Sequence, residues 1–504
     1  MSNKIKIFGL GTFAYYNGLR KRSTLFIFLA LGFFVQYGCK QTSKTTTTAL
    51  TDTSYIINFS PIPPADLDTG ADPKKLAEFA WEEFLALNWK SSYNKDQHRG
   101  TPDTSWNYYK EPGAYPDLDV WETYAHRTEL RPFSNKMLPF DNAPHYSFGD
   151  TITAGPSTIA ASFKLFNNLD ENNEIGSCDM YAHVNVFKKQ YQVLYEAKVN
   201  SEEYNYILDN YPTKQQLLSA TSKTRINIAT DSAYFPGGKT TCGCPVGVIC
   251  LPCGGGKSTG TIEIKAAWRR LTNLDDTSKF FTRKVIYYTK NAGKIFYNNA
   301  TYALIALHII HKTQNYPAFV FATFEHVDVQ KDSMGYVLLN GEGKEYGKLM
   351  TPMQDPILPA TAGATNYVHK KLPSKSIWQN YRLVGVQSKP SSDSTTTPNF
   401  FLSNYVVESD YTLNHFNGSG IGTPHNHQSN LLYKGKFLSM GGCQGCHGVA
   451  QRTLGTDFSF LLDTVGKPVV SPDISNVNNA PKLMRYINEI EQVHIQLAKL
   501  KAKK

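Results

Sequence analysis

The sequence predicts an α+β protein whose strands are mostly antiparallel and pack as a sandwich or a partial barrel. Strand-like runs dominate residues 145–430, one strong helical pattern precedes them, and an amphipathic pattern closes the chain. With 41% hydrophobic and 13% aromatic residues, the 504-residue chain can bury a large core. These features exclude a disordered protein.

Residues 1–38 have the pattern of a signal peptide. A basic region ending in LRKR leads into the apolar run STLFIFLALGFFVQYG, which is too short for a comfortable membrane span. We therefore expect the chain to be exported.

Cys39 follows this run directly and precedes a Thr-rich stretch, so residues 39–60 read as a polar tether. The pattern resembles the bacterial lipoprotein signal, in which the cysteine is lipidated. Gln36 and Tyr37 depart from it, because leucine and a small residue are preferred there. We expect a lipid-anchored protein in the periplasm or at the outer membrane of a bacterium; an ordinary cleaved signal is the alternative.

The net charge of +10 does not indicate nucleic-acid binding. Five uncompensated positive charges lie in residues 1–38, and removing them leaves +5. A short lysine-rich tail at residues 499–504 carries much of the remainder. We expect no nucleic-acid partner.

A helix is the first element predicted after the tether. Asp72 can cap it, Pro73 suits its first turn, and apolar residues recur at helical spacing. These residues are Leu76, Phe79, Ala80, Phe84 and Leu87. We expect their aromatic face to belong to the core.

The body at residues 61–430 is predicted to be β-rich. Gly, Pro and Asn-rich turns separate its strand-like runs. These runs are MYAHVNVF, YQVLYEAKV, GTIEIKAAW, RKVIYYT, ATYALIALHII and AFVFATFEHVD.

A loop at residues 242–253 carries four of the eight cysteines, Cys242, Cys244, Cys250 and Cys253. Thiols tend to oxidise outside the cytoplasm, so we expect disulfides here, with Cys178 as a fifth candidate. The spacing C-x-C-x5-C-x2-C leaves a metal site as the alternative.

The sequence GGCQGCHGVA at residues 441–450 contains a C-x-x-C-H motif. At this spacing two thiols can add to the vinyl groups of a haem while the adjoining imidazole binds its iron. We therefore expect one covalent haem c on Cys443 and Cys446, with His447 as axial ligand. A redox-active C-x-x-C is the alternative. Such motifs open a helix inside a βαβ unit, and the sequence near Cys443 does not alternate strand and helix patterns. The haem c segment is predicted to span residues 431–504 and to end in an amphipathic helix at 481–504.

Seven sequence blocks between residues 78 and 462 indicate a family when taken together. They are FAWEEFLALNWK, VWETYAHRTEL, IEIKAAWRRLT, ALIALHIIHKT, FVFATFEHVD, CQGCHGVA and TDFSFLL. This set resembles a poorly characterised family of exported bacterial c-type cytochrome proteins with one haem. The resemblance implies haem attachment at Cys443, Cys446 and His447, and it implies little about substrate.

The sixth position of the iron decides the role of such a protein. A protein ligand there favours electron transfer, whereas an open position allows a small molecule to react. Met484, 37 residues after His447, is one candidate ligand. His308 and His311 should point to opposite faces of a strand, so at most one can meet the haem. His326 could be oriented by the carboxylate of Asp328; each of the three histidines could equally be an ordinary sheet residue.

The sequence thus predicts an exported haem c protein whose leading role is electron transfer with a redox partner protein. A haem-dependent oxidoreductase acting on a small molecule is the second prediction, with His308, His311 and His326 as candidate catalytic residues. A surface lipoprotein in which haem is incidental is the third.

Overall fold

The computed structural model describes part of the chain. The described residues are 55–109, 115–159, 164–172, 179–184, 189–230, 242, 249–271, 275–329, 336–339, 359–391, 402, 404, 406–407, 431–433, 436–438, 440–462 and 470–474. The expected signal peptide, Cys39, Cys178, Cys244, Met484 and the expected terminal helix lie outside them. All described residues belong to one compact unit at residues 50–504.

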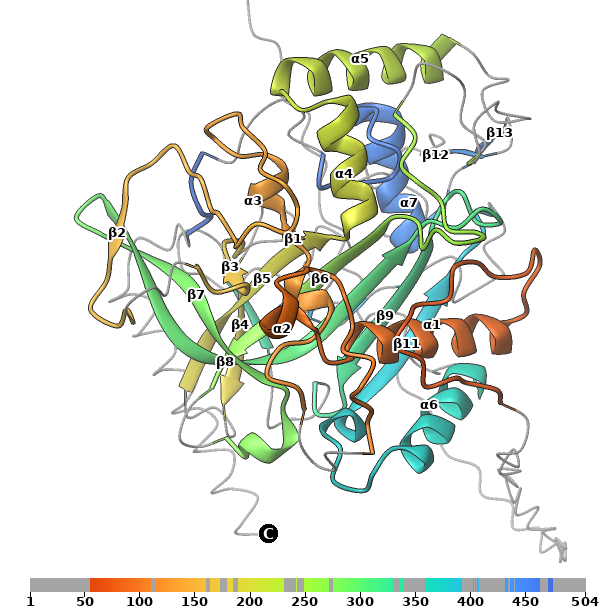
Figure 1. Cartoon of the computed structure of the whole chain (residues 1–504), viewed down its shortest axis with the longest axis horizontal. Coiled ribbons are helices and arrows are strands. Elements are labelled where there is room, and N and C mark those ends of the chain that lie inside the picture. The colour runs from red at the N-terminus through yellow and green to blue at the C-terminus, as the bar shows by residue number, and fades with distance from the viewer. Residues whose placement is uncertain are drawn as a thin grey trace, which may run out of the picture. The chain divides into compact units, whose positions relative to one another are not determined.

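The fold is α+β, with mostly antiparallel strands in a nearly closed, barrel-like sheet (Figure 1). This confirms the predicted fold class in its broad form. The helices are α1 (Pro73–Leu87), α2 (Tyr93–Asp96), α3 (Arg127–Leu130), α4 (Ser201–Asn210), α5 (Lys214–Thr230), α6 (Pro359–Lys371) and α7 (Gly442–Val449). The strands are β1 (Ala125–His126), β2 (Ile152–Ala154), β3 (Asn168–Leu169), β4 (Asp179–Val184), β5 (Lys189–Val199), β6 (Ile262–Arg270), β7 (Thr282–Asn291), β8 (Lys294–His311), β9 (Val320–His326), β10 (Tyr336–Leu339), β11 (Tyr381–Gln387), β12 (Leu431–Tyr433) and β13 (Lys436–Leu438).

Strand β8 organises the sheet because it pairs along both of its edges. Its first half pairs with β7 and β2, and its second half pairs with β6 and β9. Within the described residues, the path β10-β4-β5-β6-β8-β7-β3 runs through it, and β9 carries β11. Each of the six strand-like runs expected from the sequence overlaps one of the strands β4 to β9, so the prediction of a strand in each run is confirmed.

Helix α1 covers one face of this sheet. The side chain of Asp72 accepts a hydrogen bond from the Lys75 amide at 2.8 Å, as predicted for the cap. Phe79 and Phe84 are buried, and the ring of Phe84 lies 4.3 Å from that of Phe324 on β9. The predicted aromatic core face of this helix is confirmed.

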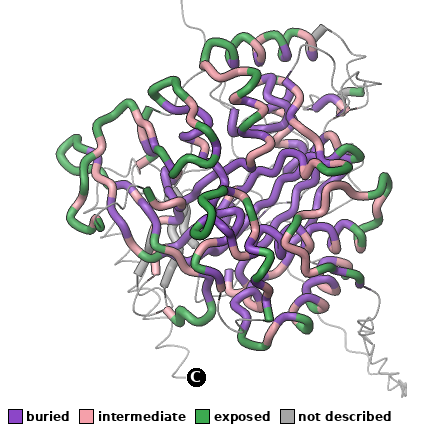
Figure 2. The backbone as a smooth tube through the Cα atoms, in the orientation of Figure 1, coloured by how far each residue is buried: buried purple, intermediate pink, exposed green. Residues whose placement is uncertain are grey.

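The opposite face of β8 and β9 packs against α4 and the segment that contains α7. Ile310 and Phe321, which are paired across these strands, share a buried cluster with Tyr204, Cys443 and Phe458. Residues 431–462 are therefore built into the same core as the β-rich body. Figure 2 shows that the central strands are buried, whereas α5 is largely exposed along one side.

Candidate functional site

Helix α7 carries the C-x-x-C-H motif and follows the β12–β13 hairpin. Cys443 and Cys446 lie one turn apart and His447 follows, so the three side chains emerge from one short stretch of helix. Both cysteines are thiols and neither is in a disulfide. Cys443 is buried and donates to the Leu402 carbonyl at 3.3 Å, while Cys446 and His447 are half-buried.

His447 is oriented by a backbone acceptor. Its Nδ1–H donates to the carbonyl oxygen of Phe458 at 2.6 Å. The ring centres of Phe321 and Phe460 lie 4.8 and 4.9 Å from the centre of the imidazole ring, in edge-to-face arrangements. In a neutral ring, a proton on Nδ1 places the lone pair on Nε2, which is the nitrogen that would bind a metal.

The acceptor lies in a turn of unusual backbone. Asp457 and Phe458 have φ values of 53° and 69°, in the left-handed region that bulky residues rarely adopt. Such a conformation costs about 1–3 kcal/mol per residue and persists only where neighbouring contacts impose it. The Asp457 carboxylate supplies these contacts, since Lys312 Nζ and the Leu251 amide both donate to it.

Two glutamines fix the start of α7 against the sheet. Gln387, at the end of β11, accepts from the Gln444 amide at 2.7 Å. The Gln444 side chain donates to the carbonyls of Ala318 and Phe319 just before β9. Gly442 allows this close approach, because a Cβ there would lie 2.6 Å from Gln387 Nε2. The motif is thus held in place by residues far away in the sequence.

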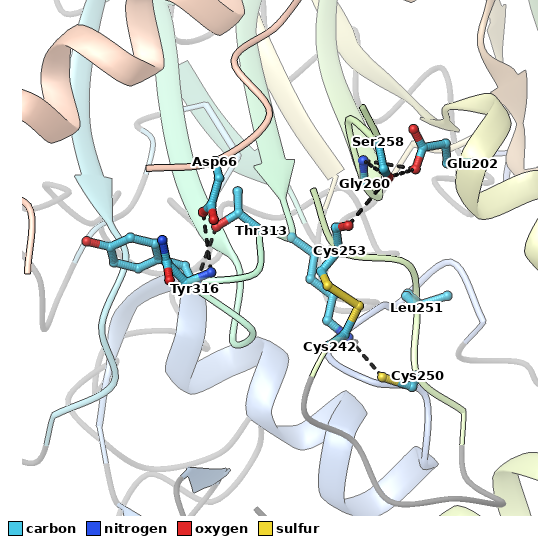
Figure 3. The surroundings of a disulfide bond; sticks show 12 residues. Asp66, Glu202, Cys242, Cys250, Leu251, Cys253, Ser258, Gly260, Thr313 and Tyr316 are labelled. Carbon is cyan, nitrogen blue, oxygen red and sulfur yellow. Dashed lines mark hydrogen bonds between the residues drawn. A yellow bond between two sulfur atoms is a disulfide. The ribbon is translucent and has the colours of Figure 1, made fainter. Parts of the chain in front are cut away.

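The cysteine loop is a neighbour of the motif. A disulfide joins Cys242 to Cys253 (Figure 3), and Cys250 is also disulfide-bonded. Ile249 and Leu251 belong to the same buried cluster as Cys443 and Phe458. Within the described part of the chain, no group of three or more His, Cys, Asp or Glu residues is arranged to hold a metal.

Glu202 of α4 binds the segment that follows this loop. Its carboxylate accepts from the Thr259 amide at 2.7 Å and from the Gly260 amide at 3.0 Å, and Ser258 also donates to it (Figure 3). The loop is therefore bound to the turn that orients His447 through Leu251, and the segment after the loop is bound to α4.

Two of the three histidines proposed from the sequence have structural roles. His311 pairs with Glu83 of α1 through Nδ1 and donates through Nε2 to the Thr259 carbonyl. His326 donates from Nε2 to the Lys279 carbonyl at 2.9 Å, and its Nδ1 accepts from the Asp328 amide. The contact with Asp328 that the structure shows is made by its backbone amide, since β9 ends at His326 and the two residues do not share a strand face.

His308 lies on the other face of β8 from His311. It precedes Ile310 by two residues, and Ile310 is paired with Phe321, whose ring contacts His447. His308 Nδ1 is hydrogen-bonded to the Thr323 hydroxyl. Of the three histidines, His308 is the one on the face that packs against α7.

Sequence reasoning did not identify Asp457, Phe458, Lys312, Gln387 or Gln444 as parts of this site. The aromatic run DFSF at residues 457–460 could have indicated Asp457 and Phe458, because it closely follows the motif. The strained turn and the partners of the two glutamines depend on long-range contacts, which no local pattern encodes.

Comparisons with family models, with curated proteins and with solved structures found no match for the chain. Among the described residues, no helix combines the length and apolar character needed to cross a membrane. The interpretation of the site therefore depends on its own geometry.

The disulfide between Cys242 and Cys253 can be tested by thiol labelling. Alkylation of the unfolded, unreduced protein should leave both cysteines unlabelled, whereas C242S should expose Cys253 to the reagent. Because the bond closes an 11-residue separation, the double variant C242S/C253S should lose about 2–3 kcal/mol in free energy of unfolding, measured by urea denaturation. Full labelling of wild type without reductant, or stoichiometric zinc, would instead support a metal site.

Proposed function

We propose that the chain is an exported c-type haem protein that transfers electrons through one covalently bound haem. Cys443 and Cys446 would form the thioether bonds, and His447 would bind the iron. The observation that carries this proposal is the hydrogen bond from His447 Nδ1 to the Phe458 carbonyl, beside two thiols on the same helix. A histidine held in this way presents Nε2 as the ligand atom.

The side chains around the motif are largely apolar. Phe321, Phe460, Leu461 and Met440 lie in or against the buried cluster around α7. When bound, haem supplies an iron that changes oxidation state by one electron. The chain's own part is to hold the two thiols and the imidazole in fixed positions. The Phe458 carbonyl also fixes the tautomer and the orientation of the imidazole, because it accepts the hydrogen bond from Nδ1.

We keep electron transfer as the leading role, because the contacts of α7 and of the acceptor turn would hold the proposed axial ligand rigidly. Gln387 and Gln444 fix the helix, and the Asp457–Lys312 ion pair fixes the acceptor turn. When the ligands of the iron are held rigidly, little structural rearrangement accompanies a change in the oxidation state of the iron. Met484 remains one candidate for the second ligand, and it lies outside the described residues.

A haem-dependent oxidoreductase is the second candidate, and one observation favours it. His308 lies on the sheet face that packs against α7. It precedes Ile310 by two residues, and Ile310 is paired with Phe321. An imidazole on this face could move a proton to or from a small substrate. In His311 and His326, both ring nitrogens contact other protein groups.

The proposed location is the periplasm or the outer membrane of a bacterium, with a lipid on Cys39. The basic and apolar pattern of residues 1–38 supports export, and the disulfide between Cys242 and Cys253 fits an oxidising compartment. The proposed partners are a redox protein or a small molecule, together with the membrane.

Haem attachment can be tested on a denaturing gel. Thioether bonds survive unfolding, so wild type produced with a cytochrome c maturation system should retain haem stain. C443A/C446A should lose the stain, whereas C242S/C253S should keep it, because that disulfide only braces the site. H447A should keep at least part of the covalent haem and change its optical spectrum, because the axial nitrogen is lost.

Loss of stain from wild type, or equal stain in C443A/C446A, would overturn the proposed function. The ferrous spectrum with carbon monoxide then separates the two roles. Slow binding by wild type is expected for a closed iron, whereas rapid binding would favour the oxidoreductase.

Membrane attachment through Cys39 has its own test. A lipidated Cys39 should place wild type in the membrane fraction, because acyl chains partition into the bilayer. C39A should release the protein or block its processing, and C443A, which leaves the N-terminus intact, serves as control. Membrane partitioning of C39A equal to that of wild type would point to an ordinary cleaved signal.

A further inference from the structure

The sulfur of Cys250 lies against a buried lysine. Lys312 directly follows β8 and is fully buried, and its Nζ donates to Cys250 Sγ at 3.6 Å (Figure 3). Cys250 is disulfide-bonded, and its partner is a cysteine outside the described residues, because every other described cysteine is accounted for. The same ammonium group also donates to the Asp457 carboxylate. One positive charge therefore joins this disulfide to the turn that orients His447.

Both groups that donate to the Asp457 carboxylate are connected to Cys250. Lys312 contacts the sulfur, and Leu251, whose amide donates to the carboxylate at 2.7 Å, is the next residue in the chain. The carboxylate in turn supports the left-handed turn whose carbonyl accepts from His447 Nδ1. A change at the Cys250 sulfur can therefore reach the imidazole by two short routes.

The backbone beside this sulfur is also attached to two helices. The Cys250 amide donates to the Tyr206 hydroxyl of α4 at 3.1 Å, and the Ile249 amide donates to the Thr224 hydroxyl of α5 at 2.9 Å. These contacts do not involve the sulfur, so they can persist when the disulfide is broken. Cys250 itself is half-buried, which leaves its disulfide within reach of a reductant.

We propose that the disulfide of Cys250 is a redox switch that sets how firmly His447 is held. The electron donor is a dithiol. One of its thiolates attacks the sulfur bonded to Cys250, the S–S bond breaks, and Cys250 leaves as a thiolate beside Lys312. The second thiol then resolves the mixed disulfide. The dithiol loses two electrons and becomes a disulfide; one of its protons goes to the former partner of Cys250 and the other goes to solvent.

The Lys312 ammonium favours this step and transmits its effect. An adjacent positive charge stabilises a thiolate, and such a thiolate leaves a disulfide more readily. Once the bond has broken, one ammonium faces two anions, the Cys250 thiolate and the Asp457 carboxylate, so its attraction for the carboxylate is shared. The strained turn then loses part of the support that offsets its strain, and the imidazole is held less firmly.

The consequence for the haem rests on the proposed function, because it requires His447 to bind the iron. The effect of Lys312 on the disulfide does not depend on haem. The two parts can therefore be measured separately.

The first part is tested by the ease of reduction. The native protein is equilibrated with mixtures of reduced and oxidised dithiothreitol, alkylated and analysed by mass spectrometry. The Cys250 disulfide should open at an about tenfold lower ratio of reduced to oxidised dithiothreitol than the Cys242–Cys253 disulfide, which corresponds to about 30 mV. K312M should abolish this difference, because it lacks the ammonium. K265M is the matched control and should keep it, since the ion-pair partner of Lys265 is Glu171.

The second part is tested by the ferrous spectrum of the haem-loaded protein, recorded across the same mixtures with the haem kept ferrous. The spectrum of wild type should change at the ratio that opens the Cys250 disulfide, because the axial imidazole is then held less firmly. C242S/C253S should show the same change, since it lacks only the other disulfide. C250S should show no change across the mixtures, because it cannot form the disulfide.

Opening of the Cys250 disulfide together with or after Cys242–Cys253 in wild type would overturn the inference, and this result does not require K312M to fold. A ferrous spectrum that stays constant while Cys250 becomes labelled would also overturn it. Absence of covalent haem would instead overturn the proposed function, while the order of reduction would still be measurable. The two failures are therefore distinguishable.

Discussion

The hydrogen bond between His447 Nδ1 and the Phe458 carbonyl is the contact on which the site depends. It fixes both the tautomer and the direction of the imidazole, which a half-buried side chain on a short helix would not keep unaided. The carbonyl is aimed by two consecutive left-handed residues, Asp457 and Phe458, whose strain must be offset by other contacts. The Asp457 carboxylate, bound to Lys312 and Leu251, provides them.

This constraint explains why distant parts of the chain meet at α7. Lys312 directly follows β8, Leu251 belongs to the disulfide-bonded loop, and Gln387 ends β11. Lys312 and Leu251 bind the Asp457 carboxylate of the acceptor turn, and Gln387 binds the start of α7, so the β-rich body serves as the scaffold of the motif. The large β-rich body supplies these contacts, which an isolated peptide carrying the motif would lack.

The sequence was informative where local patterns decide structure. Asp72, Pro73 and the spacing of Phe79 and Phe84 predicted α1, and the strand-like runs predicted β4 to β9. Helices α4, α5 and α6 were missed, because their apolar faces are narrow and tertiary packing holds them. The pairing of Cys242 with Cys253 also could not be predicted, because spacing leaves several connectivities open. The sequence placed His308 and His311 on opposite faces of a strand, but only the strand pairing and the packing showed which face meets α7.

The central claim is that Cys443, Cys446 and His447 form one haem c site. Mass spectrometry of the tryptic peptide at residues 437–452 tests it most directly, because this peptide contains all three residues. Protein produced with a cytochrome c maturation system should yield the peptide with the added mass of one haem and no thiol available for alkylation. The unmodified peptide with two alkylated cysteines, or with a disulfide between them, would contradict the account.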